Sequence, residues 1–346
     1  MKPGRTLEDF KREQQPDPDI VYLRQHVREL EARQLQERTA TGEALEIVHA
    51  LKAAIKVAAP VKMQYRAPTK STAPCTHVLH LTDWHYGAVT ERDEVDGFGE
   101  FNPEIAERRI QQLGKSIVDS TVAQRHGHNV PNLQIIGTAD YINGSIHHEL
   151  VATNAFPDPV QAVRCGYALG GLIEMFAPHF ANIKVDLITL DNHGRLTKKP
   201  QAAQGGLNNW SYVVAEIAAQ HVKRQHNVEV AVHAKPSALI PVGPERYLAF
   251  HGHQIKGWAG KPYYGFDRRA AMEAIKRMGV PEQAFTRMLM GHFHHGMNGD
   301  VWSLGGSLSG TDAFDHSCGR HSKPHQTSWF VHPRHGEFSW TRWWLS

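Results

Sequence analysis

The stretch HVLHLTDWHYG, residues 77–87, consists of an apolar segment followed directly by residues of types that can ligate metals. Residues 77–83 have the short apolar run that is typical of a buried strand. Asp83 and His85 follow at its carboxyl end, and carboxylate and imidazole groups are ligands for divalent cations. The stretch therefore predicts a strand that ends in a polar site.

Later apolar runs also end in polar residues. These runs span 132–140, 183–195, 246–252 and 287–296, and the residues at their ends are Asp140, Asn192, His193, His251, His292 and His294. One such residue alone is more often a turn or core residue. In open α/β sheets, however, the carboxyl ends of strands form the functional crevice, so the whole set is expected to converge. Oxygen and imidazole donors without thiolates favour manganese, iron or zinc over a structural zinc site.

Helical patterns separate the strand candidates, which predicts an α/β sandwich with a mixed sheet. Asn102 is expected to cap a helix that starts at Pro103 and continues through Ile117. Further helices are expected at about 159–176, 207–223 and 267–278, and a C-terminal hairpin is expected to turn at residues 333–336.

The chain divides by composition into a polar arm (1–19), a helical segment (20–58), a linker (59–75) and a main domain (76–346). In the helical segment, apolar residues recur at helical spacing on both sides of Thr41 and Gly42, so two helices are expected. Such a narrow stripe favours packing on the chain's own domain. The alternative is a coiled-coil seam that joins subunits into a homo-oligomer.

Composition excludes several classes of protein. The 346 residues carry a formal net charge of +3, which neither requires nor excludes a nucleic-acid partner. Cys75, Cys165 and Cys318 form no C-x-x-C pair, which argues against a disulfide framework and for a reducing cytoplasm. The N-terminus lacks an apolar leader, and no run reaches the roughly 18 apolar residues of a membrane span. We therefore expect a cytoplasmic protein without a membrane partner.

In the order D-x-H, D, N-H, H-G and G-H-x-H, these motifs resemble those of the calcineurin-like metallophosphoesterase family, over roughly residues 77–310. The resemblance implies a four-layer α/β/β/α sandwich with mixed sheets, preceded here by the N-terminal helical segment. It also implies two divalent metal ions, with manganese favoured and iron, zinc, nickel or magnesium as alternatives. The implied ligands are Asp83, His85 and His294 for one ion and Asn192, His251 and His292 for the other, with Asp140 as the bridge.

The implied activity is that of a metal-dependent phosphoesterase, a hydrolase. Two nearby cations can lower the pKa of a shared water toward about 7, which supplies hydroxide at neutral pH. By the resemblance, the catalytic His193 protonates the leaving group or stabilises charge on the transferring phosphoryl group. We expect a phosphodiesterase or nuclease that acts on DNA, RNA or nucleotides. The alternatives are a phosphomonoesterase acting on phosphoprotein or small molecules, and a scaffold or binding protein of this fold with weakened catalysis.

Two residues depart from the family pattern. Ala139 and Asp191 stand where the family usually has glycine, before Asp140 and Asn192 respectively. The extra carboxylate of Asp191 beside a ligand is expected to alter backbone geometry or metal affinity, and this is the basis of the scaffold alternative.

Candidates for substrate binding are less specific. Arg195, Asn143 and His147 follow the metal motifs closely enough to reach a phosphate, but each also fits an ordinary loop position. Residues 256–269, KGWAGKPYYGFDRR, mix cations with aromatic rings, which suits stacked bases and a phosphate backbone. An ordinary loop with buried aromatic rings is an equally good interpretation.

Overall fold

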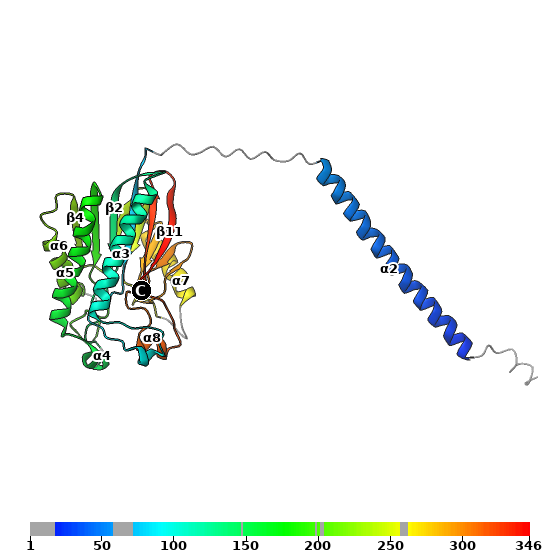
Figure 1. Cartoon of the computed structure of the whole chain (residues 1–346), viewed down its shortest axis with the longest axis horizontal. Helices are drawn as coiled ribbons and strands as arrows, with labels where there is room; N and C mark the ends of the chain where they lie inside the picture. The colour runs from blue at the N-terminus through cyan, green and yellow to red at the C-terminus, as the bar shows by residue number, and fades with distance from the viewer. Residues whose placement is uncertain (1–17, 58–71, 147, 198, 201–203, 257–261) are drawn as a thin grey trace, which may run out of the picture. The chain divides into compact units, whose positions relative to one another are not determined.

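The computed structural model describes residues 18–57, 72–146, 148–197, 199–200, 204–256 and 262–346 (Figure 1). The chain forms two compact units, residues 1–67 and 68–346. In the described ranges, no helix has both the length and the apolar character that a membrane crossing requires. The proposed arm and most of the proposed linker, residues 1–17 and 58–71, lie outside the described residues.

The N-terminal unit contains one described helix, α2 (Pro18–Val57), which is 40 residues long. The expectation of two helices is therefore wrong. An isolated glycine costs a helix only about 1 kcal/mol relative to alanine, so Gly42 weakens α2 without ending it. Thr41 is also compatible with a continuous helix, because its Oγ1 donates to the carbonyl oxygen of Glu37 at 2.8 Å.

A six-stranded mixed sheet forms the centre of the second unit. Its parallel strands are β1 (Pro74–Leu81), β2 (Asn129–Gly137), β3 (Asn182–Ile188) and β4 (Val228–His233). The C-terminal hairpin adds β10 (His325–His332) and β11 (Gly336–Trp344) antiparallel beside β1, in the order β11-β10-β1-β2-β3-β4. The expected hairpin and the expected strands within residues 77–83, 132–140 and 183–195 are thus confirmed.

A second mixed sheet has five short strands in the order β5-β6-β7-β9-β8. They are β5 (Ala238–Val242), β6 (Glu245–Ala249), β7 (Arg287–Met290), β8 (Met297–Asn298) and β9 (Trp302–Leu304). Strands β6, β7 and β9 are parallel, whereas β5 and β8 are antiparallel to their neighbours. The protein therefore has a mixed α/β fold with two mixed sheets and an N-terminal helix.

The longer helices of this unit are α3 (Pro103–Gln124), α5 (Asp158–Phe176), α6 (Trp210–His221) and α7 (Tyr263–Arg277). Shorter ones are α4 (His148–Thr153), α8 (Ala313–Ser317) and the 3₁₀ turns η1 (Arg92–Val95), η2 (Ala177–His179) and η3 (Pro281–Gln283). Asn102 caps α3 as expected, because its Oδ1 accepts from the backbone N–H of Ile105 at 2.9 Å. In Figure 1, α5 and α6 lie at one side of this unit and α7 at the other.

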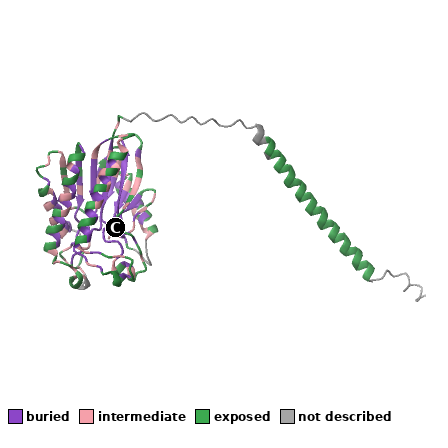
Figure 2. Ribbon diagram, in the orientation of Figure 1, coloured by how far each residue is buried: buried purple, intermediate pink, exposed green. Residues whose placement is uncertain are grey.

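Neighbouring residues of one strand pack into different clusters of the hydrophobic core. In β1, Leu79 packs among the residues of α3, α5 and α6, whereas Val78 packs among side chains of both sheets. In β6, Tyr247 belongs to the same inter-sheet cluster, whereas Leu248 packs with Phe266 of α7. Successive strand residues point to opposite faces, so both sheets are covered on both faces. Figure 2 shows the resulting burial of the strands.

Two buried histidines make this fold sensitive to acid. His77 bonds Thr121 Oγ1 and Ser328 Oγ, each at 2.8 Å, and His80 Nε2 lies 2.8 Å from Thr138 Oγ1. Burial lowers the pKa of both imidazoles from 6.5 to about 3, so both are neutral in the folded protein. The unfolded chain takes up protons below about pH 6.5 that the folded chain does not, so stability present at neutral pH is lost as the pH falls toward about 3.

We expect His80→Gln to reduce the difference in free energy of unfolding between about pH 7 and about pH 5 by about 2 kcal/mol. Glutamine keeps a hydrogen-bonding group for Thr138 but does not titrate. Urea unfolding at the two pH values measures the difference. The exposed His226 offers a matched control, since His226→Gln should leave the difference unchanged. An unaltered pH dependence in His80→Gln would contradict this explanation.

Candidate metal centre

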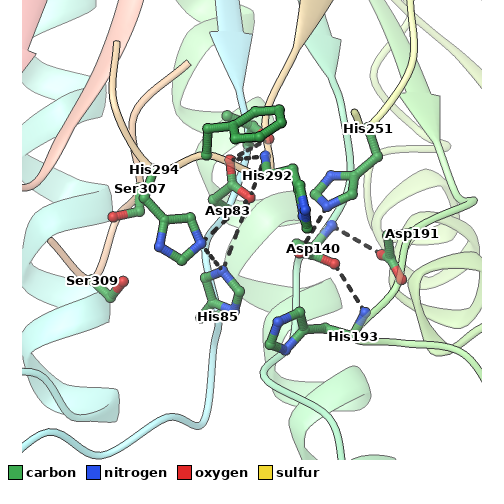
Figure 3. Close-up of polar contacts among 12 residues, drawn as sticks. Asp83, His85, Asp140, Asp191, His193, His251, His292, His294, Ser307 and Ser309 are labelled. Atoms are coloured by element: carbon green, nitrogen blue, oxygen red, sulfur yellow. Dashed lines mark hydrogen bonds and ion pairs between the residues drawn. The ribbon is translucent and has the colours of Figure 1, made fainter. Parts of the chain in front are cut away.

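Loops at the carboxyl ends of five strands bring the expected ligands to one place (Figure 3). Asp83 follows β1, Asp140 follows β2, Asn192 and His193 follow β3, His251 follows β6, and His292 and His294 follow β7. Their ligand atoms form overlapping groups, in each of which all atoms lie within 4.8 Å of one another. The groups are Asp83 with His85 and His294, His85 with Asp140 and His193, and Asp140 with His251 and His292. The expected convergence is therefore confirmed.

The first group consists of the buried side chains of Asp83, His85 and His294. His85 Nε2 and His294 Nε2 are 3.0 Å apart, and each lies 3.9 Å from Asp83 Oδ1. Burial and the neighbouring His193 and His294 hold the pKa of His85 well below its usual range, so His85 is neutral and keeps a lone pair. The three atoms surround one point, as the ligands of a single cation do.

A further group consists of His251, Asp140 and Asn192. His251 Nε2 lies 2.8 Å from Asp140 Oδ2 and 3.0 Å from Asn192 Oδ1. His251 Nδ1 lies 2.8 Å from the carbonyl oxygen of Thr138, and a carbonyl can only accept, so Nδ1 carries a hydrogen. In the neutral ring, Nε2 presents a lone pair to the two oxygens, whereas in the imidazolium it donates a hydrogen to them. When the ring is neutral, no donor among the described residues satisfies the buried Asp140 Oδ2, and a cation at this point would satisfy all three atoms.

The electrostatics of the site also favour a positive charge. Burial opposes protonation of His251, but the Asp140 carboxylate and its hydrogen bond raise the pKa of His251 to about 9. Burial likewise opposes protonation of His294, but Asp315 and Asp83 raise its pKa to about 10. A positive charge is therefore favoured at both of these imidazoles, and either a proton or a bound metal ion can provide it.

The backbone at the site is strained. Several non-glycine residues have a φ between 46° and 71°, in the left-handed region, namely Asp83, His85, Ala139, Asp140, His292 and His294. Such conformations persist where the surrounding structure imposes them, and they concentrate at functional sites. Backbone bonds from Asp83 N to the Ala139 oxygen and from His85 N to the Asp140 oxygen, both 3.1 Å, join the two loops. Ala139 thus occupies a conformation that favours glycine, at φ 71°.

Contacts behind the ligands orient them. His294 Nδ1 lies 2.8 Å from Asp315 Oδ2 in α8, so its Nε2 is directed toward His85. Both carboxylate oxygens of Asp83 accept from the backbone N–H of His292 at 2.9 Å. Partners of this kind fix the tautomer and position of a ligand. Sequence analysis missed Asp315 because it follows no strand and matches no motif.

Asp191 is buried behind the ligands and does not point at them. Its Oδ2 accepts from the backbone N–H of Asp140 at 2.9 Å and from Ser211 Oγ. Its Oδ1 accepts from Gly194 N and Asn209 Nδ2, both at 2.8 Å. Burial and the Asp140 carboxylate raise the pKa of Asp191, and the hydrogen bonds oppose this. The carboxylate therefore joins the loops that follow β2 and β3 (Figure 3).

His193 lies at the edge of the ligand groups. Its ring centroid is 4.6 Å from that of His85, in an edge-to-face arrangement, and its backbone N–H donates to Asp140 Oδ1 at 3.2 Å. Its Nδ1 lies 2.7 Å from the carbonyl oxygen of Asn143, so Nδ1 is a donor and Nε2 is the nitrogen that can serve a substrate.

The remaining candidates have other roles or lie outside the description. The Asn143 amide donates to Asn154 Oδ1 at 2.8 Å, and Arg195 Nε donates to the carbonyl oxygen of Thr197 at 3.0 Å. Both contacts hold loops, and neither side chain is shown to face a substrate. His147 lies outside the described residues.

The basic and aromatic segment is described only in part, because residues 257–261 lie outside the description. Tyr263 and Tyr264 are exposed, at 56% and 79%. Arg269 pairs with Glu273 at 2.8 Å and packs over Phe250, so it has a structural role. The expectation of buried aromatic rings is wrong for the two tyrosines.

No family model and no curated protein matches the chain. Among solved structures, AQ665 from Aquifex aeolicus, a protein of unknown function, aligns with 65% of this chain and 83% of its own, at 11% identity and a TM-score of 0.25. A second solved structure aligns with 78% of this chain and 99% of its own, at 10% identity and a TM-score of 0.30.

Proposed function

We propose that the protein is a two-metal phosphoesterase of the calcineurin-like metallophosphoesterase type, acting on phosphodiesters of nucleic acid or nucleotides. The observation that carries the proposal is the position of Asp140. Its buried carboxylate belongs both to a group with His85 and to a group with His251, and its Oδ2 lies 2.8 Å from His251 Nε2. A bridging carboxylate between two cations requires this arrangement.

The core supports the same fold family. One cluster lies between the helices α3, α5 and α6 and the first sheet, a second contains side chains of both sheets, and a third lies between the second sheet and α7. This succession supports a four-layer α/β/β/α sandwich.

Neutral and anionic donors are combined in a way that suits a divalent cation. Asp83, His85 and His294 would hold one ion, and Asn192, His251 and His292 the other, with Asp140 between them. Burial holds the pKa of His292 well below its usual range, as it does for His85, and only a neutral imidazole can bind a metal. When bound, two such ions supply Lewis-acid stabilisation of phosphate oxygens and lower the pKa of water. Manganese is the favoured ion for these donors, with iron, zinc, nickel or magnesium as alternatives.

The side chain of His193 has a separate role in this proposal. The Asn143 carbonyl accepts a hydrogen bond from its Nδ1–H, which fixes the orientation of the ring. Nε2 can then hold the proton that the leaving oxygen of the ester requires. This role corresponds to general acid catalysis, which typically contributes about 10²- to 10⁴-fold to a rate.

Exposed aromatic and basic side chains favour a nucleic-acid substrate. Tyr263, Tyr264, Lys256 and Arg268 are all exposed. Aromatic faces stack with bases irrespective of sequence, and cations follow the backbone phosphates. A phosphodiester of DNA, RNA or a nucleotide is therefore preferred to a phosphomonoester.

Purified protein that is stripped with a chelator should lose activity and regain it with Mn²⁺. We expect hydrolysis of bis-p-nitrophenyl phosphate to exceed hydrolysis of p-nitrophenyl phosphate, and elemental analysis to give two metal ions per chain. A preference for the monoester would favour a phosphomonoesterase. A protein that binds two ions but hydrolyses neither substrate would favour the scaffold alternative, and a protein that binds no metal would refute the proposal.

A further inference from the structure

Toward both ends of α2, apolar side chains recur with a seven-residue repeat. Counting from Ile20 in alternating steps of three and four residues gives the a and d positions of a heptad along the whole helix. The a positions are Ile20, Val27, Gln34, Thr41, Val48 and Ile55, and the d positions are Leu23, Leu30, Glu37, Ala44 and Leu51. This spacing averages 3.5 residues, which is the period of a left-handed coiled coil rather than of an isolated helix.

Among the described residues of its own unit, the helix has no partner for this stripe. Leu23, Val27, Leu30 and Val48 are all exposed, and α2 is the one described element of residues 1–67. At 40 residues, α2 is much longer than an average helix of about 11–12 residues, and a pattern of such length is typical of coiled coils. Most helical stability in proteins comes from packing of the apolar face, so this stripe requires a partner.

We propose that α2 pairs with α2 of a second copy of this chain to form a parallel, two-stranded coiled coil, independent of the proposed hydrolase activity. The residue types at the seam specify this partner. At both ends of the repeat the a positions are β-branched and the d positions are leucine, and this distribution favours parallel dimers over trimers and tetramers. Because the seam consists of the same residues on both helices, it is complementary to itself.

Charges beside the seam agree with the parallel, in-register arrangement. In such a dimer, each g position faces the e position five residues later on the other helix. Asp19 would face the partner subunit's Arg24, which is an attractive pair, and His26 would face the partner subunit's Glu31.

The centre of the repeat is polar. Arg33 would face the partner subunit's Arg38, and Glu37 would face the partner subunit's Glu37 across the seam, so both pairs repel and weaken the centre of the coiled coil. Gln34 and Thr41 occupy the flanking a positions. Polar residues at a positions fix register at a cost in stability, so this centre disfavours staggered pairing.

Light scattering of the full chain tests the association. The wild type should give twice the chain mass of 38.8 kDa at micromolar concentration. Leu30→Glu places a charge in the seam and should weaken association by at least ~100-fold, giving one chain mass. Leu35→Glu is the matched control, because Leu35 is exposed at a b position, off the seam, and should leave the dimer intact. Circular dichroism checks that both variants retain helix. A monomeric wild type, or equal effects of the two substitutions, would overturn the proposal.

Disulfide formation tests the orientation. The exposed Cys318 is first replaced by serine, which leaves the buried Cys75 and Cys165. Leu23→Cys should then form a covalent dimer on mild oxidation, because equivalent d positions face each other only in a parallel, in-register pair. Val21→Cys, at a neighbouring b position, should remain uncrosslinked. Absence of crosslinking in Leu23→Cys, or a trimer by light scattering, would refute the parallel two-stranded arrangement.

Discussion

Asp140→Asn should lower phosphodiester hydrolysis by at least ~10³-fold, because it removes the carboxylate that we propose to bridge the two ions. Asparagine has nearly the same size, but it carries no charge, and its NH₂ group cannot bind a cation. The neighbouring His251 would also lose its closest carboxylate, which now lies 2.8 Å from Nε2. Elemental analysis should therefore show fewer than two metal ions per chain at the metal concentration that saturates the wild type.

A matched control exists in β3. Asp186 is a partly buried aspartate whose Oδ1 lies 2.7 Å from His233 Nε2, outside the candidate metal centre. Asp186→Asn makes the same chemical change to an Asp–His pair and should leave both metal content and hydrolysis within about threefold of the wild type. If Asp140→Asn instead binds two ions and retains wild-type activity, the bridging role assigned to Asp140 is wrong.

Much of this centre could be predicted from the sequence because each ligand follows an apolar run. Asp83, Asp140 and His251 are far apart in the chain, but the carboxyl ends of β1, β2 and β6 bring them together. The ends of these strands can be used for such a prediction because the functional crevice of an α/β fold lies at the carboxyl ends of its strands, here of strands from both sheets. The start of α3 could also be predicted, because the capping residue Asn102 and Pro103 are adjacent in the sequence.

Other features of the fold and of the candidate site could not be predicted from the local sequence. Strand β5 contains Pro241, and β8 has two residues, so neither shows an alternating pattern. Asp315 reaches His294 from α8, and no spacing rule links the two positions. The left-handed φ of Ala139 was also hidden, because alanine gives no indication of a positive φ. Tertiary contacts determine all of these, and a single sequence does not display them.

Asp191→Gly should lower hydrolysis by about 10²-fold, whereas a degenerate site that Asp191 had inactivated would gain activity. The substitution removes the acceptor for the backbone N–H groups of Asp140 and Gly194, which now lie 2.9 and 2.8 Å from the carboxylate. The substitution introduces the glycine of the family pattern. In this chain, however, the Asp191 carboxylate holds the two loops together through its hydrogen bonds. The loop that carries Asn192 and His193 should then lose its fixed position relative to Asp140.

The pattern of kinetic changes separates positioning from general loss of structure. We expect kcat to fall more than KM rises, because in the proposed mechanism His193 and Asp140 act on the reacting phosphate rather than on substrate affinity. Asp191→Asn should recover part of the loss, since its amide oxygen can still accept from one of the two backbone N–H groups. Ser211→Ala removes a different donor to the same carboxylate and should reduce kcat by less than about tenfold. Thermal unfolding identifies any variant whose loss reflects global destabilisation. Wild-type or higher activity in Asp191→Gly would mean that the carboxylate does not position the site and that the departure from the family pattern weakens catalysis.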